Sequence, residues 1–145
     1  MNMPGYYKQP ELTGKVLRDG YFVSSDLGYF DEEGFLYVTG RKDDIINVGG
    51  LKVYPSEIEN AALGIRGIEE CICFGIPDEI TGRAVKLLIR TNEHFTGTVA
   101  HIQEELSKVM DYYKVPKSIE IVDEIEKTAN GKPNRKFYQN MVTGK

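Results

Sequence analysis

The chain has 145 residues, of which 41% are hydrophobic and 28% are charged, a balance that is typical of a globular domain and argues against disorder. Acidic residues outnumber basic residues by 22 to 18, whereas a nucleic-acid-binding surface normally carries a basic excess, so no nucleic-acid partner is expected. The longest apolar stretches are far too short to span a bilayer, and the N-terminus lacks the pattern of a secretory signal. We therefore expect a soluble, cytoplasmic domain without a membrane span.

The first 40 residues contain few aliphatic side chains from which a core could be built. Residues 21–23 and 35–38 are rich in aromatic and β-branched residues, so we expect two short strands there, with a polar turn over residues 31–34 between them. These strands would have little of their own chain to pack against. Residues 1–40 are therefore expected to be the edge of something larger.

Residues 45–53 follow the pattern of a tight β-hairpin. Two apolar runs flank Gly49 and Gly50, and a glycine pair supplies the positive φ angles that a two-residue turn needs. A helix is expected to begin just beyond this hairpin, because Ser56 can cap it and Glu59 completes the pattern of a capping box.

The remaining sequence predicts a small mixed domain. Residues 70–76 and 84–91 are strand-like, and residues 98–110 place apolar residues three or four apart, as an amphipathic helix does. Residues 118–122 predict a further short strand before a basic tail. The order predicts an α+β fold, in which a small sheet with helices packed on it is preceded by a β-hairpin and a short β remnant of a larger domain.

The chain contains none of the common catalytic patterns G-x-S-x-G, H-E-x-x-H and G-x-G-x-x-G. Cys71 and Cys73 lie two apart on an expected strand and so face one side of it, where small buried hydrophobic residues are the favoured interpretation. His94 and His101 are expected at the surface. No metal site is predicted.

Two polar features near residue 40 are candidates for binding a nucleotide. Asp26 follows an expected strand, and its carboxylate could accept hydrogen bonds from both hydroxyls of a ribose, although the residues alone favour a side chain that caps a turn. Arg41 offers a planar fork of donors to sugar or phosphate oxygens. The segment around it could instead be a solvated linker, and a polar junction of this kind is also where a hinge would absorb backbone rotation.

Two further features combine glycine with lysine. Gly49 and Gly50 would let a ligand approach the backbone closely, and Lys52 beside them could meet a phosphate, although an ordinary hairpin turn explains the glycines equally well. Lys132 stands among small and turn-forming residues in a segment with four bases and no acids, residues 127–136. Such a lysine suits a phosphate or a carboxylate, or it belongs to a solvated basic tail.

In this order and spacing, the four features resemble the C-terminal part of the adenylate-forming enzymes, the superfamily of acyl-CoA synthetases, adenylation domains and luciferases. Residues 20–28 are similar to the family segment G-W-x-x-T-G-D-L-G, and residues 40–59 are similar to G-R-x-D-D … G-G-x-x-V-x-P-x-E-I-E. Residues 113–116 and 127–136 resemble Y-K-x-P … K-T-x-x-G-K-x-x-R. The resemblance runs over nearly the whole chain, from residue 5 to residue 136.

The resemblance implies a function and a domain organisation. Family members join a small-molecule carboxylic acid to ATP, which gives an acyl-adenylate and pyrophosphate, and then pass the acyl group to a thiol, usually that of coenzyme A, with release of AMP. Mg²⁺ is expected to come with ATP rather than to be bound by this chain alone. Residues 1–40 would be the C-terminal edge of the large N-terminal adenylating domain, and residues 41–145 would be the mobile C-terminal lid domain.

The resemblance also assigns roles to four residues around the nucleotide. Asp26 would hold the ribose hydroxyls, and Arg41 would contact the same ribose. Lys52 matches a basic or polar position near the nucleotide phosphates. Lys132 falls on the family's catalytic lysine, which bridges the carboxylate and the α-phosphate during adenylation.

Three further residues would serve the change between the two half-reactions. Asp43 falls at the hinge about which the small domain rotates, and Gly49 and Gly50 match the loop that lines the pantetheine tunnel of coenzyme A after that rotation. The sequence departs from the family at two positions. Ser25 stands where the family usually has glycine, which weakens the ribose assignment, and Asn47 stands where many members have lysine, which removes one possible phosphate contact.

The expected function is therefore that of the C-terminal part of an acyl-CoA synthetase, and the chain alone is expected to be inactive. The segment 47–55 is similar to that of acyl-CoA ligases, whereas the tail 130–136 is closer to the adenylation domains of peptide synthetases. Two alternatives stay open: an adenylation domain that loads a carrier-protein thiol, and a stand-alone, non-catalytic binding module with the lid fold. The activated acid is not predicted.

Overall fold

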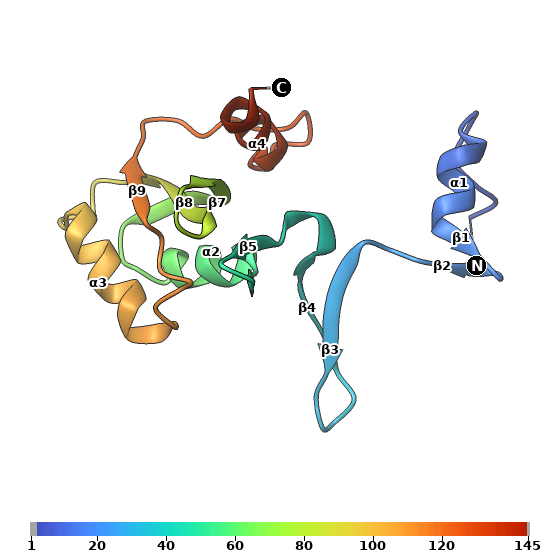
Figure 1. The fold of residues 1–145 in the computed structure, drawn as a ribbon, viewed down its shortest axis with the longest axis horizontal. Helices are drawn as coiled ribbons and strands as arrows, with labels where there is room; N and C mark the ends of the chain where they lie inside the picture. The colour runs from blue at the N-terminus through green and yellow to red at the C-terminus, as the bar shows by residue number, and fades with distance from the viewer. Residues whose placement is uncertain (1–2, 145) are drawn as a thin grey trace.

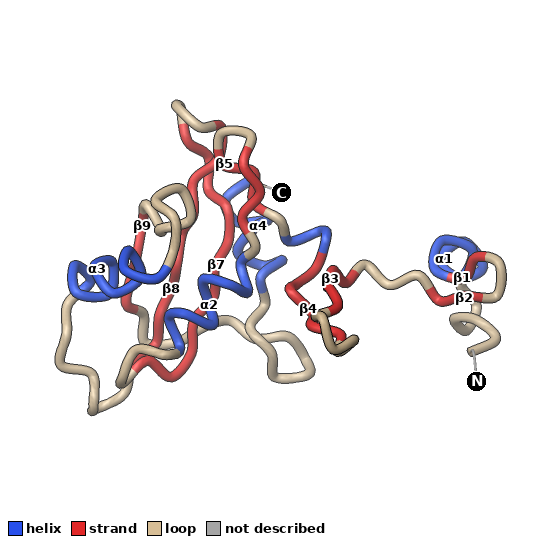
Figure 2. Tube along the Cα trace, turned by 90° about the horizontal axis from the view of Figure 1, so that it is seen from below, coloured by secondary structure: helices blue, strands red, loops and turns tan. Residues whose placement is uncertain are grey.

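The computed structural model describes residues 3–144, which form three parts in chain order (Figure 1). The first part consists of α1 (Pro10–Val16) and the two-residue strands β1 (Leu17–Arg18) and β2 (Tyr21–Phe22). Figures 1 and 2 both show it lying apart from the rest of the molecule, joined by one extended loop. Helix α1 was not predicted, because it buries no residue and so has no apolar stripe to reveal it.

The second part is an antiparallel hairpin of β3 (Asp26–Phe30) and β4 (Leu36–Arg41). Strand β4 confirms the strand expected around residues 35–38 and continues as far as Arg41. The rings of Tyr29 and Tyr37 stack across the hairpin with their centroids 5.4 Å apart. Most side chains of both strands are exposed, so the hairpin contributes little to the core.

The third part is a compact α+β unit, as the sequence predicted. Its sheet has the strand order β7-β8-β9, with β7 and β8 antiparallel and β8 and β9 parallel. The short hairpin β5–β6 precedes it, and the helices α2, α3 and α4 complete it. The elements are η1 (Lys42–Asp44, a 3₁₀ helix), β5 (Ile46–Val48), β6 (Leu51–Val53), α2 (Pro55–Leu63), β7 (Ile68–Asp78), β8 (Gly82–Thr91), α3 (Val99–Val109), β9 (Ser118–Ile121) and α4 (Arg135–Thr143).

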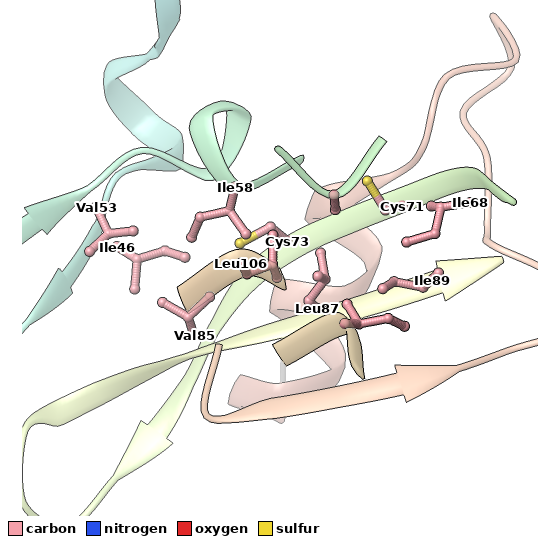
Figure 3. Packing of buried hydrophobic residues seen from close by; sticks show 12 residues of the cluster. Ile46, Val53, Ile58, Ile68, Cys71, Cys73, Val85, Leu87, Ile89 and Leu106 are labelled. Carbon is pink, nitrogen blue, oxygen red and sulfur yellow. The ribbon is translucent and has the colours of Figure 1, made fainter. Parts of the chain in front are cut away.

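The sheet has a hydrophobic cluster on each face, because successive residues of a strand point to opposite sides. Cys71 and Cys73 of β7 face the larger cluster, which packs under α2, α3 and the β5–β6 hairpin (Figure 3). Ile72 and Phe74 face the smaller one, where the ring of Phe74 stacks on Tyr138 of α4 at 5.3 Å. Both cysteines are buried as expected, and burial raises the pKa of Cys71 to about 12.

One local prediction was wrong, and one helix was not predicted. The capping box does not form, because α2 begins at Pro55 and has no side-chain hydrogen bond at its N-terminus. The hydroxyl of Ser56 instead donates to the carbonyl oxygen of Thr39. In addition, no helix was predicted after residue 122, yet the basic tail continues into α4, which Asn134 caps by accepting a hydrogen bond from the backbone N–H of Phe137 at 3.1 Å.

Candidate functional site

Asp26 and Arg41 lie opposite each other at the open end of the β3–β4 hairpin. They are cross-strand partners, and Arg41 Nε lies 3.9 Å from a carboxylate oxygen of Asp26, with the two side chains 61% and 53% exposed. Arg41 also donates from Nη2 to the hydroxyl oxygen of Ser25 at 2.6 Å. The carboxylate and the guanidinium therefore present acceptors and donors side by side, with Ser25 holding the guanidinium in place.

Asp26 and Arg41 share a surface pocket with Asp43. The pocket has a volume of about 630 Å³, and Phe22 and Val23 form part of its apolar wall. Asp43 is exposed and belongs to η1, which joins the hairpin to the compact unit. Three of the residues singled out in the sequence are thus brought to one place, next to the segment that the resemblance assigns to the hinge.

Gly49 and Gly50 form the turn of the β5–β6 hairpin, as predicted. Their φ angles of +58° and +89° are those of a two-residue turn that favours glycine at both positions. The N–H of Gly49 donates to the carbonyl oxygen of Thr81 at 3.0 Å, so this turn is attached to the β7–β8 turn. A Cβ atom added at Gly50 would meet no atom within 4 Å, which leaves that side of the turn open.

Lys52 and Asn47 are cross-strand partners below the glycine turn. Asn47, which departs from the family pattern, accepts a hydrogen bond from the N–H of Gly50 at 2.9 Å. The side chain of Lys52 is exposed. Asn47 therefore stabilises the glycine turn, a role that its position in the sequence did not suggest.

Lys132 lies in a hydrogen-bonded turn between β9 and α4. Its carbonyl oxygen accepts from the N–H of Thr128 at 2.8 Å, and its own N–H donates to the Thr128 hydroxyl at 3.3 Å. Gly131 has a φ of +78°, and an isolated β-bridge joins Lys127 and Pro133 at the base of the turn. The turn fixes the backbone of Lys132 while its side chain is exposed to solvent.

The lysine turn and the nucleotide candidates are not joined. Within residues 3–144, none of the hydrogen bonds or ion pairs links the side chain of Lys132 to Asp26 or Arg41. In the same part of the chain, no group of three or more His, Cys, Asp or Glu residues is placed to hold a metal ion. No helix among these described residues is long and apolar enough to cross a membrane.

Sequence reasoning assigned no role to Arg135, although it is part of the motif around Lys132. Its guanidinium lies 2.9 Å from a carboxylate oxygen of Asp44 and also pairs with Glu59. Burial opposes the charge, but the neighbouring carboxylates outweigh it, so the pKa of Arg135 is raised. No local signal could have revealed these contacts, because Asp44 and Glu59 precede Arg135 by 91 and 76 positions.

Residues 57–132, just over half of the chain, match the family described as the AMP-binding enzyme C-terminal domain. The chain belongs to this family. The match contains the expected sheet, the helix α3 and Lys132. It confirms the resemblance to the C-terminal domain of adenylate-forming enzymes.

Relatives of this AMP-binding C-terminal domain carry the names of CoA ligases. The long-chain-fatty-acid–CoA ligase of Bacillus subtilis (strain 168) is 40% identical over 90% of this chain and 23% of its own length. The 2-succinylbenzoate–CoA ligase of Geobacillus sp. (strain WCH70) is 38% identical over 95% of this chain and 28% of its own length. The chain therefore spans about a quarter of these relatives.

Solved structures agree on the fold. The amide bond synthetase McbA from Marinactinospora thermotolerans is 30% identical and superposes with a TM-score of 0.88 over 97% of this chain and 29% of its own. ATP-bound MatB from Rhodopseudomonas palustris is also 30% identical, with a TM-score of 0.81 over 96% of this chain and 29% of its own. The α+β prediction is thus confirmed by structural neighbours as well as by the elements themselves.

Proposed function

We propose that this chain is the C-terminal part of an ATP-dependent acyl-CoA synthetase, with residues 41–145 acting as its mobile lid. The observation that carries the proposal is that one compact unit, beyond a polar hinge segment, presents two exposed turns of different chemistry. One holds Lys132 and the other holds Gly49 and Gly50. The names of the relatives support coenzyme A as the acceptor.

In the first half-reaction, an oxygen of the substrate carboxylate attacks the α-phosphorus of ATP. A bond forms between that oxygen and phosphorus, the bond to the β-phosphate breaks, and pyrophosphate leaves. Asp26 would accept hydrogen bonds from the ribose hydroxyls, and Arg41 would donate to the ribose. The ammonium group of Lys132 would offset the repulsion between the two anionic groups at the point where charge develops.

In the second half-reaction, the thiol of coenzyme A attacks the acyl carbon of the adenylate. The carbon–sulfur bond forms as the acyl–oxygen bond to AMP breaks, and the thiol proton is released. A turn without side chains at Gly49 and Gly50 would leave room for the narrow pantetheine arm to pass. Rotation at Asp43 would exchange the lysine turn for this glycine turn at one shared site.

The chain's own residues fit the nucleotide better than they fit a metal. The Asp26–Arg41 pair and its pocket suit a ribose, whereas the described residues contain no cluster of metal ligands. Mg²⁺ is proposed to enter with ATP, where it would neutralise phosphate charge. Lys52, which is exposed beside the glycine turn, would lie near the phosphates.

The division at residue 40 is part of the proposal. Large apolar side chains exposed on both faces of the β3–β4 hairpin support it, because an element that leaves both faces apolar normally packs against a partner. In the proposed enzyme, the large N-terminal domain would cover these side chains. The exposed apolar residues of the hairpin are Tyr29, Phe30, Phe35, Leu36, Tyr37 and Val38.

A hybrid enzyme tests the proposal directly. In it, this chain replaces the homologous part of the Bacillus subtilis long-chain-fatty-acid–CoA ligase, and acid-dependent pyrophosphate release and thioester formation are measured. We expect the hybrid to release pyrophosphate and to form a thioester with coenzyme A, and the 145-residue chain alone to form no acyl-adenylate.

The choice of acceptor separates the alternatives. Thioester formation on a phosphopantetheinylated carrier protein but not on coenzyme A would favour a carrier-loading adenylation domain instead. A hybrid that binds ATP without any acid-dependent pyrophosphate release would favour the non-catalytic binding module. The unmodified Bacillus enzyme is the positive control, and its large domain without a lid is the negative control.

A further inference from the structure

Arg135 connects four elements that are distant in sequence. It is the first residue of α4, and its Nε donates to the carbonyl oxygen of Cys73 in β7 at 2.8 Å. Its Nη1 lies 2.9 Å from a carboxylate oxygen of Asp44 in η1, and its Nη2 pairs with Glu59 of α2. Glu59 in turn accepts from the N–H of Cys73 at 2.8 Å. The guanidinium therefore joins the hinge segment, residues 42–44, to the centre of the compact unit.

This network is more enclosed than an ordinary surface ion pair. The side chains of Arg135, Asp44 and Glu59 are only 20%, 23% and 18% exposed. Enclosed, charge-assisted hydrogen bonds are less screened by solvent, and a planar guanidinium can serve three acceptors in fixed directions where a lysine cannot. The arrangement thus holds Asp44 in one position relative to α4.

The same end of α4 also fixes the lysine turn. Lys132 precedes Arg135 by three residues, and the N–H of Asn134 donates to the carbonyl oxygen of Glu126 across the base of the turn at 2.8 Å. The N–H of Glu126 donates to the hydroxyl of the buried Tyr138 at 2.8 Å. The position of the turn therefore follows the position of the first turn of α4.

The glycine turn reaches the hinge segment by a different route. Strand β5 begins two residues after Asp44, and its Ile46 is buried in the larger cluster. Gly49 follows directly at the end of this strand. The glycine turn is therefore connected to the hinge by a short, packed piece of chain, whereas Lys132 is connected to it across the fold through Arg135.

We propose that Arg135 is a positioning residue that links the hinge segment to the Lys132 turn, so that rotation at Asp43 delivers Lys132 in a fixed orientation. This inference rests on the proposed function for its catalytic consequence. Loss of the link loosens the coupling of the lysine turn to the hinge while the glycine turn keeps its own packed connection. Adenylation is then impaired more than transfer to the thiol.

Half-reaction kinetics of the hybrid enzyme test the catalytic consequence, with Asp44→Asn as the main variant because it removes the charge from only the arm that reaches the hinge. We expect acyl-adenylate formation to fall by about ten- to a hundredfold, the range in which a small misplacement costs catalysis. Thioester formation from added acyl-adenylate is expected to stay within about threefold of the unmodified hybrid. Arg135→Lys should reproduce the imbalance, and Arg135→Gln should deepen it.

Lys114→Gln is the matched control. Lys114 is equally enclosed, at 17% exposure, and also pairs with two carboxylates, those of Glu57 and Asp111, at 2.8 and 3.5 Å. Neither partner belongs to the hinge segment or to the lysine turn, so this variant should change both half-reactions by the same factor. Equal losses in both half-reactions for Asp44→Asn would overturn the positioning role.

Hydrogen exchange in the 145-residue chain tests the link without any activity. We expect faster exchange of the amides in residues 127–134 in Asp44→Asn and Arg135→Lys, and unchanged exchange there in Lys114→Gln. Unchanged exchange in all three variants would overturn the inference whatever the hybrid does. If instead the unmodified hybrid forms no acyl-adenylate, the proposed function fails, while the exchange result still decides whether Arg135 holds the turn.

Discussion

Ser25 shows how a residue that departs from a family pattern can still serve the site. Its hydroxyl accepts a hydrogen bond from Arg41 at 2.6 Å, and its carbonyl oxygen accepts one from the N–H of Lys42 at 2.8 Å. The sequence suggested only that Ser25 weakens the ribose assignment. The structure shows that its side chain orients the guanidinium beside Asp26.

Replacing Ser25 with the glycine usual in the family should therefore weaken nucleotide binding. The variant removes a hydrogen bond to a charged group, which is worth about 1.5–3 kcal/mol. Part of this is recovered when water solvates the exposed Arg41, so we expect the KM for ATP in the hybrid enzyme to rise by about three- to tenfold, with little change in kcat. An unchanged KM would show that the Ser25 hydroxyl does not orient Arg41 for the nucleotide.

At the scale of elements, the sequence predicted those whose signal is local. The β5–β6 hairpin follows from two glycines between apolar runs, and α3 follows from an apolar period that buries Ile102 and Leu106. Helix α4 escaped prediction because Tyr138 is its one buried residue among those described. The capping box failed because the fold uses the Ser56 hydroxyl to contact Thr39, which the local pattern cannot show.

The β7–β8 turn makes the stability of the compact unit dependent on pH. The Asp78 carboxylate pairs with Lys117 and accepts hydrogen bonds from the backbone N–H and the hydroxyl of Thr81 at 2.9 and 2.8 Å. The ammonium of Lys117, followed by these donors, holds the pKa of Asp78 well below its ordinary value of 3.8. The same Thr81 accepts from the N–H of Gly49, so this turn also supports the glycine turn.

The sign of this pH effect follows from linkage. The unfolded chain binds a proton at Asp78 at a higher pH than the folded chain does, so protonation favours unfolding. The stabilisation is complete above about pH 5 and is lost progressively as the pH falls from the ordinary pKa of the unfolded side chain towards the lower pKa of the folded one. We expect Asp78→Asn to lower the melting temperature at pH 6 and to flatten its decline between pH 6 and 3. A decline parallel to that of the unmodified chain would contradict the role given to Asp78.

At the scale of the whole molecule, the core and the proposed nucleotide pocket lie in different parts of the chain. Every residue of the two hydrophobic clusters comes from the segment after residue 45, whereas Asp26 and Ser25 precede it. The sequence could indicate this division from the scarcity of aliphatic residues before residue 40. It could not indicate the link from Asp44 to Arg135, because that link depends on how distant segments meet in the folded chain.

A chain that begins at residue 41 should therefore fold without the first 40 residues. The shortened chain lacks the hydrogen bond of Ser56 with Thr39 and that of Arg41 with Ser25. We expect the loss of these contacts to lower its free energy of unfolding by about 1–3 kcal/mol. Urea unfolding followed by circular dichroism would show a single cooperative transition. Loss of that transition would contradict the division of the chain at residue 40.

The exchange of two turns at one site is tested most directly in the hybrid enzyme. The rates of acyl-adenylate formation and of thioester formation are measured for Lys132→Ala and for Gly50→Trp. Gly50→Ala is the matched control, because it carries the same backbone strain of a side chain at a φ of +89°. Its Cβ atom meets no neighbour, so any difference between the alanine and tryptophan variants comes from the bulk of the tryptophan ring. Lys136→Ala, an exposed lysine four residues on, is the control for lost charge.

We expect opposite effects of the two variants on the two half-reactions. Lys132→Ala should abolish most acyl-adenylate formation and spare thioester formation from added acyl-adenylate, because the ammonium group acts only where the carboxylate meets the α-phosphate. Gly50→Trp should spare the first reaction and block the second, because its ring would fill the route of the thiol. Equal losses in both half-reactions for each variant would contradict the exchange of two turns at one site.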